Sequence, residues 1–173
     1  LPLANPSPVF GLALLLIGLL LGVSRLLAVD ELPLIGLLST LALEHAWYFN
    51  RYHFDRSDAV LLLGWNVGFY AIFTAFPFFF RRDFAGKVLP WIAAALSGPL
   101  HFKLIHSLIQ TAWPNHAMGL LPAAFAIPSL FAVVALVKST PPSSPARNSQ
   151  LAWFGGVALF FITLIFPIQF DRQ

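Results

Sequence analysis

The chain has 173 residues, of which 58% are hydrophobic and only 10% are charged, and its mean hydropathy is +0.80. A soluble domain of this length carries roughly 25% charged residues, so the composition indicates a protein of the lipid bilayer. The net charge is +3, but the ten Lys and Arg residues stand singly or in pairs, all except Lys103 at the ends of apolar segments, instead of forming a basic stripe, which argues against nucleic acid as a partner.

Six apolar segments follow one another along the chain, each near the ~20 residues that a helix needs to cross a ~30 Å hydrocarbon core. All six should be helices, because an open sheet cannot satisfy its backbone hydrogen bonds in lipid. The sequence therefore predicts an all-α, polytopic transmembrane helical bundle with about six spanning helices. The predicted helices cover residues 9–29, 32–49, 59–80, 88–113, 118–137 and 151–169.

The longest connection is the segment KSTPPSSPARNSQ, residues 138–150, which is rich in proline and serine. This composition is typical of a solvated linker. We therefore expect residues 1–137 to form a five-helix transmembrane unit and residues 151–173 to form a sixth helix that leads into further sequence. The first residue is Leu1 and not methionine, so we expect the chain to be a segment of a longer protein.

The basic residues divide unevenly between the two sides of the predicted bundle. Cytoplasmic loops of membrane proteins carry an excess of Lys and Arg, so the richer side is expected to be cytoplasmic. This orientation places both ends of the chain and the loop 50–58 on the outer face. The richer side carries Arg25, Arg81, Arg82, Lys87, Lys138 and Arg147, and the other side carries Arg51, Arg56 and Arg172.

Arg81 and Arg82 directly follow the aromatic run FPFFF, residues 76–80. Aromatic and basic side chains gather at the membrane–water interface, where they fix the depth of a helix. Trp113, at the end of the predicted fourth helix, has the same character. We expect Arg81, Arg82 and Trp113 to be interface anchors, and the two arginines to meet anionic lipid headgroups.

The predicted helix over residues 88–113 is long enough to span a bilayer, yet His101, Lys103 and His106 lie in its interior. A charge near the bilayer centre costs at least ~2.5–3.5 kcal/mol on insertion scales, so such residues face a bundle interior or an aqueous cavity. The five-residue spacing of the two histidines points the imidazoles apart and argues against a shared metal. We expect neither a metal nor a cofactor.

At ~100° per residue, the polar residues of this helix fall on two faces. Lys103, His106 and Gln110 share one face, whereas His101 lies with Ser97 on the opposite side. The helix should therefore contact other protein on both sides.

Two neighbouring predicted helices carry polar residues at a similar depth. Asn66 and Tyr70 stand four residues apart on one, and Glu44 lies near the outer end of the other. At ~1.5 Å per residue, Glu44, Asn66, His106 and Lys103 all lie ~9–15 Å inside the outer ends of their helices, in the outer half of the membrane. We expect a polar pocket that opens outward, with Glu44 as counter-ion to Lys103 or His106. The predicted pocket residues are Glu44, Asn66, Tyr70, Lys103, His106 and Gln110.

A structural interpretation of the same residues stays open. A buried pair of Glu44 and Lys103 would fix which helices pack together and do no chemistry, since such pairs are retained for specificity as well as for function. Lys103 alone could also extend its stem toward the interface. The loop residues Arg51, His53, Asp55, Arg56 and Asp58 are expected to be solvated.

Four strings resemble a known family: FYAIFTAFPFFFRRDF (69–84), PWIAAALSGPLHF (90–102), MGLLPAAFAIPSL (118–130) and LAWFGGVALFFITLIFPIQFDRQ (151–173). They are similar to the bacterial predicted membrane proteins catalogued as domain of unknown function 2339. The resemblance implies a long, many-helix protein of the bacterial inner membrane. It implies no reaction and assigns no functional residue.

The chain has no cysteine, no Walker loop, no Gly-x-Ser-x-Gly elbow and no His-Glu-x-x-His motif, so whether it is an enzyme stays open. Three functions are consistent with polar residues buried in an apolar helical bundle. The first is a transport or ligand-binding segment whose pocket takes a small molecule or lipid through Lys103 and Glu44. The second is a membrane enzyme acting on a lipid or glycan carrier, with His106 or Glu44 as general base. The third is a scaffold in the membrane. In each case the partners are the lipid bilayer and the remaining transmembrane helices of the parent protein.

Overall fold

The computed structural model describes residues 5–51, 56–113 and 118–170. Within these ranges the chain forms seven α-helices and no strand, which confirms the predicted all-α fold class. The bounds of each predicted helix are correct to within four residues, and the single-turn helix α4 was not expected. The helices are α1 (Ser7–Leu27), α2 (Leu32–Arg51), α3 (Arg56–Phe79), α4 (Arg81–Phe84), α5 (Leu89–Ala112), α6 (Leu120–Ser139) and α7 (Arg147–Phe170).

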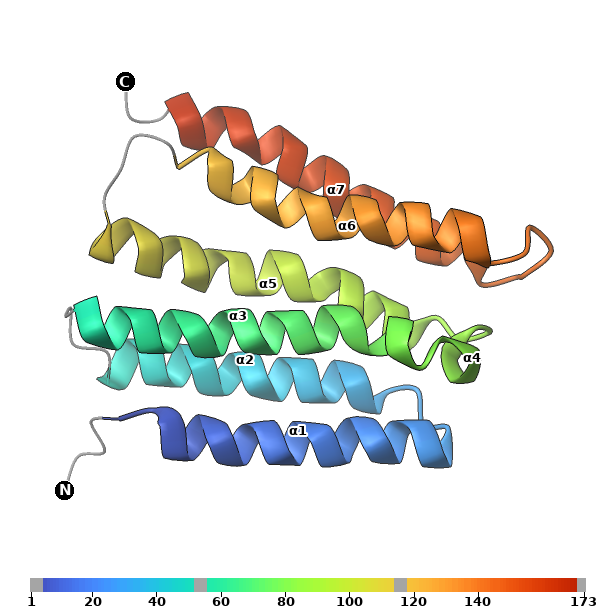
Figure 1. Cartoon of the computed structure of the whole chain (residues 1–173), viewed down its shortest axis with the longest axis horizontal. Helices are drawn as coiled ribbons and strands as arrows, with labels where there is room; N and C mark the ends of the chain where they lie inside the picture. The colour runs from blue at the N-terminus through green and yellow to red at the C-terminus, as the bar shows by residue number, and fades with distance from the viewer. Residues whose placement is uncertain (1–4, 52–55, 114–117, 171–173) are drawn as a thin grey trace.

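The long helices run alternately in opposite directions and lie side by side (Figure 1). In this view α1, α3, α5 and α6 form a row, with α2 behind α3 and α7 behind α6. The helix α5 contacts α2, α3, α6 and α7, and is therefore the centre of the bundle. Short connections force this antiparallel order, because consecutive helices joined by a few residues must reverse direction.

Five of the described helices are long and apolar enough to cross a membrane: α1, α3 from Asp58 on, α5, α6 and α7. The helix α2 has 20 residues and runs alongside them, but Glu44, His45 and Asn50 make it more polar. Side chains on the outside of the bundle are apolar, as a lipid-facing surface requires; Leu15, Leu26 and Phe131 are more than two-thirds exposed. The chain is therefore a membrane protein.

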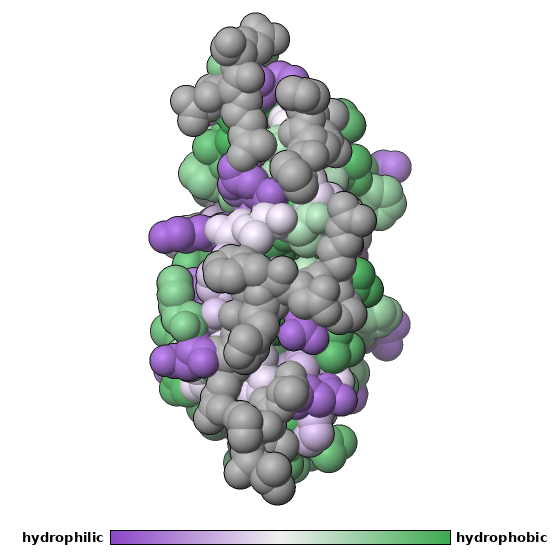
Figure 2. All heavy atoms as spheres, turned by 90° about the vertical axis from the view of Figure 1, so that its left-hand side faces the viewer, coloured by the Kyte–Doolittle hydropathy of each residue, from purple (hydrophilic) through white to green (hydrophobic). Residues whose placement is uncertain are grey.

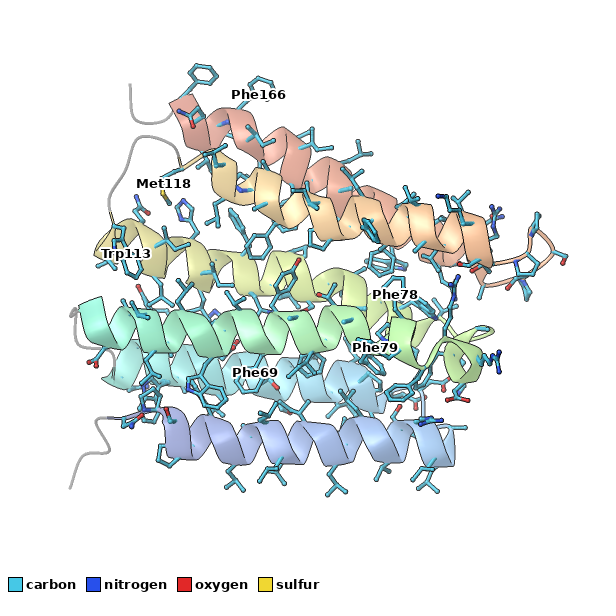
Figure 3. All side chains as sticks on the ribbon, in the orientation of Figure 1. Phe69, Phe78, Phe79, Trp113, Met118 and Phe166 are labelled. Carbon is cyan, nitrogen blue, oxygen red and sulfur yellow. The ribbon has the colours of Figure 1, made fainter. Side chains whose placement is uncertain are left out.

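Aromatic rings fill the space around α5. The Phe161 ring, which is fully buried, lies 5.3 Å from the rings of Phe102 and Phe125. In lipid, helix association depends on close packing because burial from water no longer favours it, and large flat rings provide many contacts. Figure 3 shows Phe69 inside the bundle, whereas Phe166 points away from it.

One end of the bundle gathers the six basic residues predicted to share a side; we call it the basic end. It lies at the right of Figure 1, where α1 joins α2 and α6 joins α7. Arg25 Nε pairs there with Asp83 Oδ2 at 2.6 Å, and Lys87 pairs with Asp30. Figure 2 shows the opposite end, where hydrophilic residues lie among the residues drawn in grey and hydrophobic side chains lie along the flanks.

The connection between α6 and α7 is shorter than the predicted linker, because α6 continues to Ser139 and α7 begins at Arg147. The proline-rich residues lie in turns over 140–146, while Gln150, at the predicted end of the linker, is buried and helical. Its amide nitrogen donates to the carbonyl oxygens of Ala85 and Lys87 at 3.3 and 3.2 Å. The helix α7 also packs against α5 and α6, so it belongs to the same bundle as the preceding helices.

Candidate functional site

Glu44 on α2 and His101 on α5 face each other inside the bundle. His101 Nε2 lies 3.3 Å from Glu44 Oε2, and both side chains are 0% exposed. His101 is near the middle of α5, ~18 Å from Leu89 and ~17 Å from Ala112 at 1.5 Å per residue. We call these two residues the buried pair. An acid and a base thus meet at mid-depth of the membrane bundle.

Ser97 holds the imidazole of His101 in place from one turn earlier on α5. His101 Nδ1 lies 2.7 Å from the Ser97 carbonyl oxygen, which can only accept a hydrogen bond, so Nδ1 carries a proton. This bond leaves Nε2 to face Glu44. The Ser97 hydroxyl also lies 3.3 Å from Nδ1 and donates to the Tyr70 carbonyl oxygen at 3.4 Å.

The helix α3 closes the site from a second direction. The Tyr70 ring centroid lies 6.2 Å from that of His101, and the Tyr70 ring also stacks on Phe125 at 4.9 Å. Asn66, one turn earlier on α3, is 1% exposed. Three helices therefore contribute polar groups to one buried site. We call Glu44, Asn66, Tyr70, Ser97 and His101 the buried layer.

Several polar atoms of this layer have no hydrogen-bond partner among the described residues: both carboxyl oxygens of Glu44, Nε2 of His101, and the amide oxygen and nitrogen of Asn66. Unpartnered polar groups are rare in protein interiors because each costs on the order of 1–3 kcal/mol. The 3.3 Å approach of the buried pair is an ion-pair distance without the alignment of a hydrogen bond. The layer thus retains unused capacity to bind a proton or a small polar ligand.

The chemistry of the buried pair centres on a single proton. With Nδ1 protonated, Nε2 and Oε2 can approach only if a proton lies on one of them, as a carboxylic acid beside neutral imidazole or a carboxylate beside imidazolium. The grooves found between the described helices are lined by other residues. No group of three or more His, Asp or Glu side chains that could hold a metal occurs in the part of the chain that the structure describes.

The predicted counter-ion of Glu44 was wrong. Glu44 faces His101, and neither Lys103 nor His106 pairs with it. Lys103 is exposed on the outside of α5, and His106 is half-buried with its ring 5.6 Å from that of Phe102. The physical reason is that α5 turns its Ser97 face, and not its Lys103 face, toward α2 and α3.

The other predicted pocket residues are divided between two places. Asn66 and Tyr70 lie with the buried pair, as described above. Gln110 is half-buried. It lies more than two helical turns after His101 along α5, on the same side of the helix as Lys103. The structure therefore brings Glu44, Asn66 and Tyr70 into one layer and leaves Lys103, His106 and Gln110 outside it.

The three predicted interface anchors all lie near helix ends. Arg81 is half-buried, and its guanidinium donates to Ala135 O at 3.4 Å and to Thr140 Oγ1 at 3.3 Å. Arg82 is exposed, and Trp113 is half-buried directly after α5. Figure 3 shows Trp113 at that end of the bundle. Arg81 thus binds the last turn of α6, a role that the sequence did not indicate.

His101 belongs to the candidate site but was not among the predicted pocket residues. The sequence showed that it shares a face with Ser97, whereas the bond that orients its ring comes from the Ser97 backbone carbonyl, which a residue of any type could supply. The loop residues His53 and Asp55 and the turn 114–117 lie outside the described residues.

Comparison of the chain with family models, with curated proteins and with solved structures found no match.

Proposed function

We propose that this chain is a proton-binding segment of a multi-spanning membrane protein, and that the buried pair is its site. This function belongs to the transport and ligand-binding class. The observation that carries it is the enclosure of Glu44 and His101, both 0% exposed and 3.3 Å apart, at the middle of the bundle. Ionisable groups at that depth are expensive in lipid and are typical of proton relays and ion pathways.

A proton fits this site better than a larger ligand. Both side chains are 0% exposed, and the five grooves described between helices are lined by other residues, so a larger molecule would have to displace packed side chains to reach the pair. A proton needs only a transient chain of hydrogen-bonding groups. Two other titratable side chains could take part in such a chain: Tyr70 on α3, whose ring centroid lies 6.2 Å from that of His101, and His45, which follows Glu44 on α2.

We further propose the bacterial inner membrane as the location, with the basic end in the cytoplasm. The gathering of six basic residues at one end of the bundle supports this orientation. The bacterial origin is proposed only on the resemblance of the four sequence strings to the domain of unknown function 2339, which the family comparison does not support. The chain has no cysteine, so a single Ser144→Cys substitution between α6 and α7 gives a clean test. A membrane-impermeant thiol reagent should label it only from the cytoplasmic side; labelling from outside contradicts the orientation.

The proton site is tested by infrared spectroscopy of the reconstituted chain over a pH series. A protonated carboxylic acid absorbs apart from a carboxylate, so each acid can be followed by removing it. Glu44→Gln should delete one carboxylic acid band that titrates in the wild type. His101→Gln should move the pH at which that band appears, because the imidazole lies 3.3 Å from the carboxyl group and its charge acts on that group's protonation. In proteoliposomes with an internal pH dye, both variants should slow proton entry.

Asp58→Asn is the matched control, since Asp58 is an acid of the first turn of α3, far along the helix from the buried layer. It should leave the Glu44 band and its pH response unchanged. If the pH-dependent changes in the spectra of wild type and Glu44→Gln coincide while both retain their helical content, Glu44 exchanges no proton over this pH range. The buried pair is then a structural brace between α2 and α5.

A further inference from the structure

Lys103 lies on the outside of α5, directed away from the buried pair. It is exposed, whereas His101, Phe102, Leu104 and Ile105 around it in sequence are buried. At ~100° per residue it shares its face with Pro99 one turn before and Ser107 one turn after. We call Pro99, Lys103 and Ser107 the Lys103 face. This face is the outer surface of a helix that is long and apolar enough to cross the membrane.

The depth of Lys103 makes this exposure costly. The residue is ~21 Å from Leu89 and ~14 Å from Ala112, so it lies within ~4 Å of the midpoint of α5. Helical side chains lean toward the N-terminal end of their helix, here the more distant Leu89 end. The ~6 Å stem of a lysine therefore does not bring the ammonium to either interface of a ~30 Å core.

The described part of the chain supplies no partner for Lys103. No ion pair or hydrogen bond of its ammonium is found there. The described acids are engaged elsewhere or lie at helix ends, far from mid-depth. Asp30 pairs with Lys87, Asp83 with Arg25 and Glu44 with His101, while Glu31 and Asp58 lie where α2 and α3 begin.

A groove lies beside the Lys103 face. It has a volume of about 520 Å³ and is formed by Pro99 of α5 and by α7, including Trp153, Gly156 and Phe160. A Cβ atom placed on Gly156 would meet nothing within 4 Å, so the floor of the groove is open at that point. Small residues at such a surface let the backbone of another helix approach closely. The apolar groove and the charged Lys103 side chain are therefore neighbours on one surface of the bundle.

We propose that the Lys103 face and this groove bind a transmembrane helix that carries a carboxylate near its middle. Charge complementarity selects the occupant, because a cation at mid-depth is neutralised only by an acid at the same depth. A helix can present one there since its backbone is satisfied internally, whereas a lipid phosphate stays at the headgroup level. A second copy of the chain does not fit, because its acid at mid-depth, Glu44, is buried.

Synthetic helices test this inference. The full chain carries a donor dye on Thr111→Cys, an exposed position two turns beyond Lys103 in a chain without other cysteines. It is reconstituted in phosphatidylcholine vesicles with an acceptor-labelled Leu/Ala helix that has one central glutamate, or one central glutamine. Energy transfer measured against helix concentration gives the two affinities. The glutamate helix should bind roughly tenfold more tightly, a difference of ~1.4 kcal/mol.

The preference should disappear in Lys103→Leu and persist in Lys103→Arg, which keeps the charge. Arg82→Leu is the matched control, since Arg82 is an exposed basic residue at the basic end, and it should keep the full preference. Equal binding of the two helices to the wild type, or a preference that survives Lys103→Leu, overturns the inference. So does loss of the preference when phosphatidylglycerol is added, because the ammonium would then be held by a lipid headgroup.

Discussion

A double-mutant cycle on the buried pair measures how strongly Glu44 and His101 stabilise each other. The variants are Glu44→Leu, His101→Leu and the combination of the two. Each single change leaves a fully buried polar partner without its counterpart, which costs ~1–3 kcal/mol for a neutral group and ~3–5 kcal/mol where a charge remains. The combination replaces both groups by apolar side chains of similar size, which is often nearly neutral.

We therefore expect a coupling energy of ~2 kcal/mol or more between positions 44 and 101. A coupling energy of this size distinguishes a strongly coupled buried pair from an ordinary hydrogen bond, because ordinary hydrogen bonds between membrane helices couple by only ~0.6 kcal/mol on average. The larger value follows from complete burial of both side chains and from the Ser97 carbonyl, which fixes the orientation of the ring.

The free energies come from reversible unfolding of the four proteins in mixed micelles with increasing SDS, followed by circular dichroism. The exposed pair Arg25 and Asp83 provides a control cycle, because its side chains are 48% and 41% exposed and such pairs contribute ~0–1 kcal/mol. A coupling below ~0.5 kcal/mol at Glu44 and His101 refutes the reasoning, since the two groups would then be independent.

Three further predictions concern packing and helix ends, each checked by SDS unfolding unless stated. Phe161→Ala should destabilise by ~2 kcal/mol, because a cavity on the order of 100 Å³ costs ~24 cal/mol per Å³ while transfer to lipid adds little; a loss below ~0.5 kcal/mol contradicts the packing described. Gly98→Leu should cost ~1–3 kcal/mol, because even a Cβ there lies 3.2 Å from the Phe161 ring, whereas Gly68→Leu, with nothing within 4 Å, should be tolerated. Arg81→Ala should speed hydrogen exchange in the last turn of α6 by roughly tenfold, since its bonds to Ala135 O and Thr140 Oγ1 are lost; unchanged exchange refutes that role.

Hydropathy predicted the helices well because every span must cross the same thickness of lipid and must form all its backbone hydrogen bonds internally. The ends could be read from charges and turn residues, as at Asp30 and at the residues after Arg82. The single-turn helix α4 was missed because four residues carry no periodic signal.

The candidate site was harder to predict because periodicity assigns residues to faces of one helix and does not say which face meets which neighbour. For α5 the rule that charged residues turn inward predicts that the face with Lys103 lies in the bundle interior. The structure turns Ser97 and His101 inward, and their partner is Glu44. The depths of Glu44 and His101 could be read from sequence, whereas their pairing depends on the rotation of α5 about its own axis.

The central position of α5 has a consequence for how the protein enters the membrane. This helix is the least apolar of the five that can span, and it carries His101, Lys103 and His106. Charged side chains near the centre of a helix oppose its release from the translocon into lipid. We therefore expect α5 to remain at the translocon until α2 and α3, made earlier in synthesis, cover its Ser97 face, and to leave as part of a group. Insertion of α5 would then depend on helices already made, whereas α3 and α6, before and after it in the sequence, are each apolar enough to enter the bilayer alone.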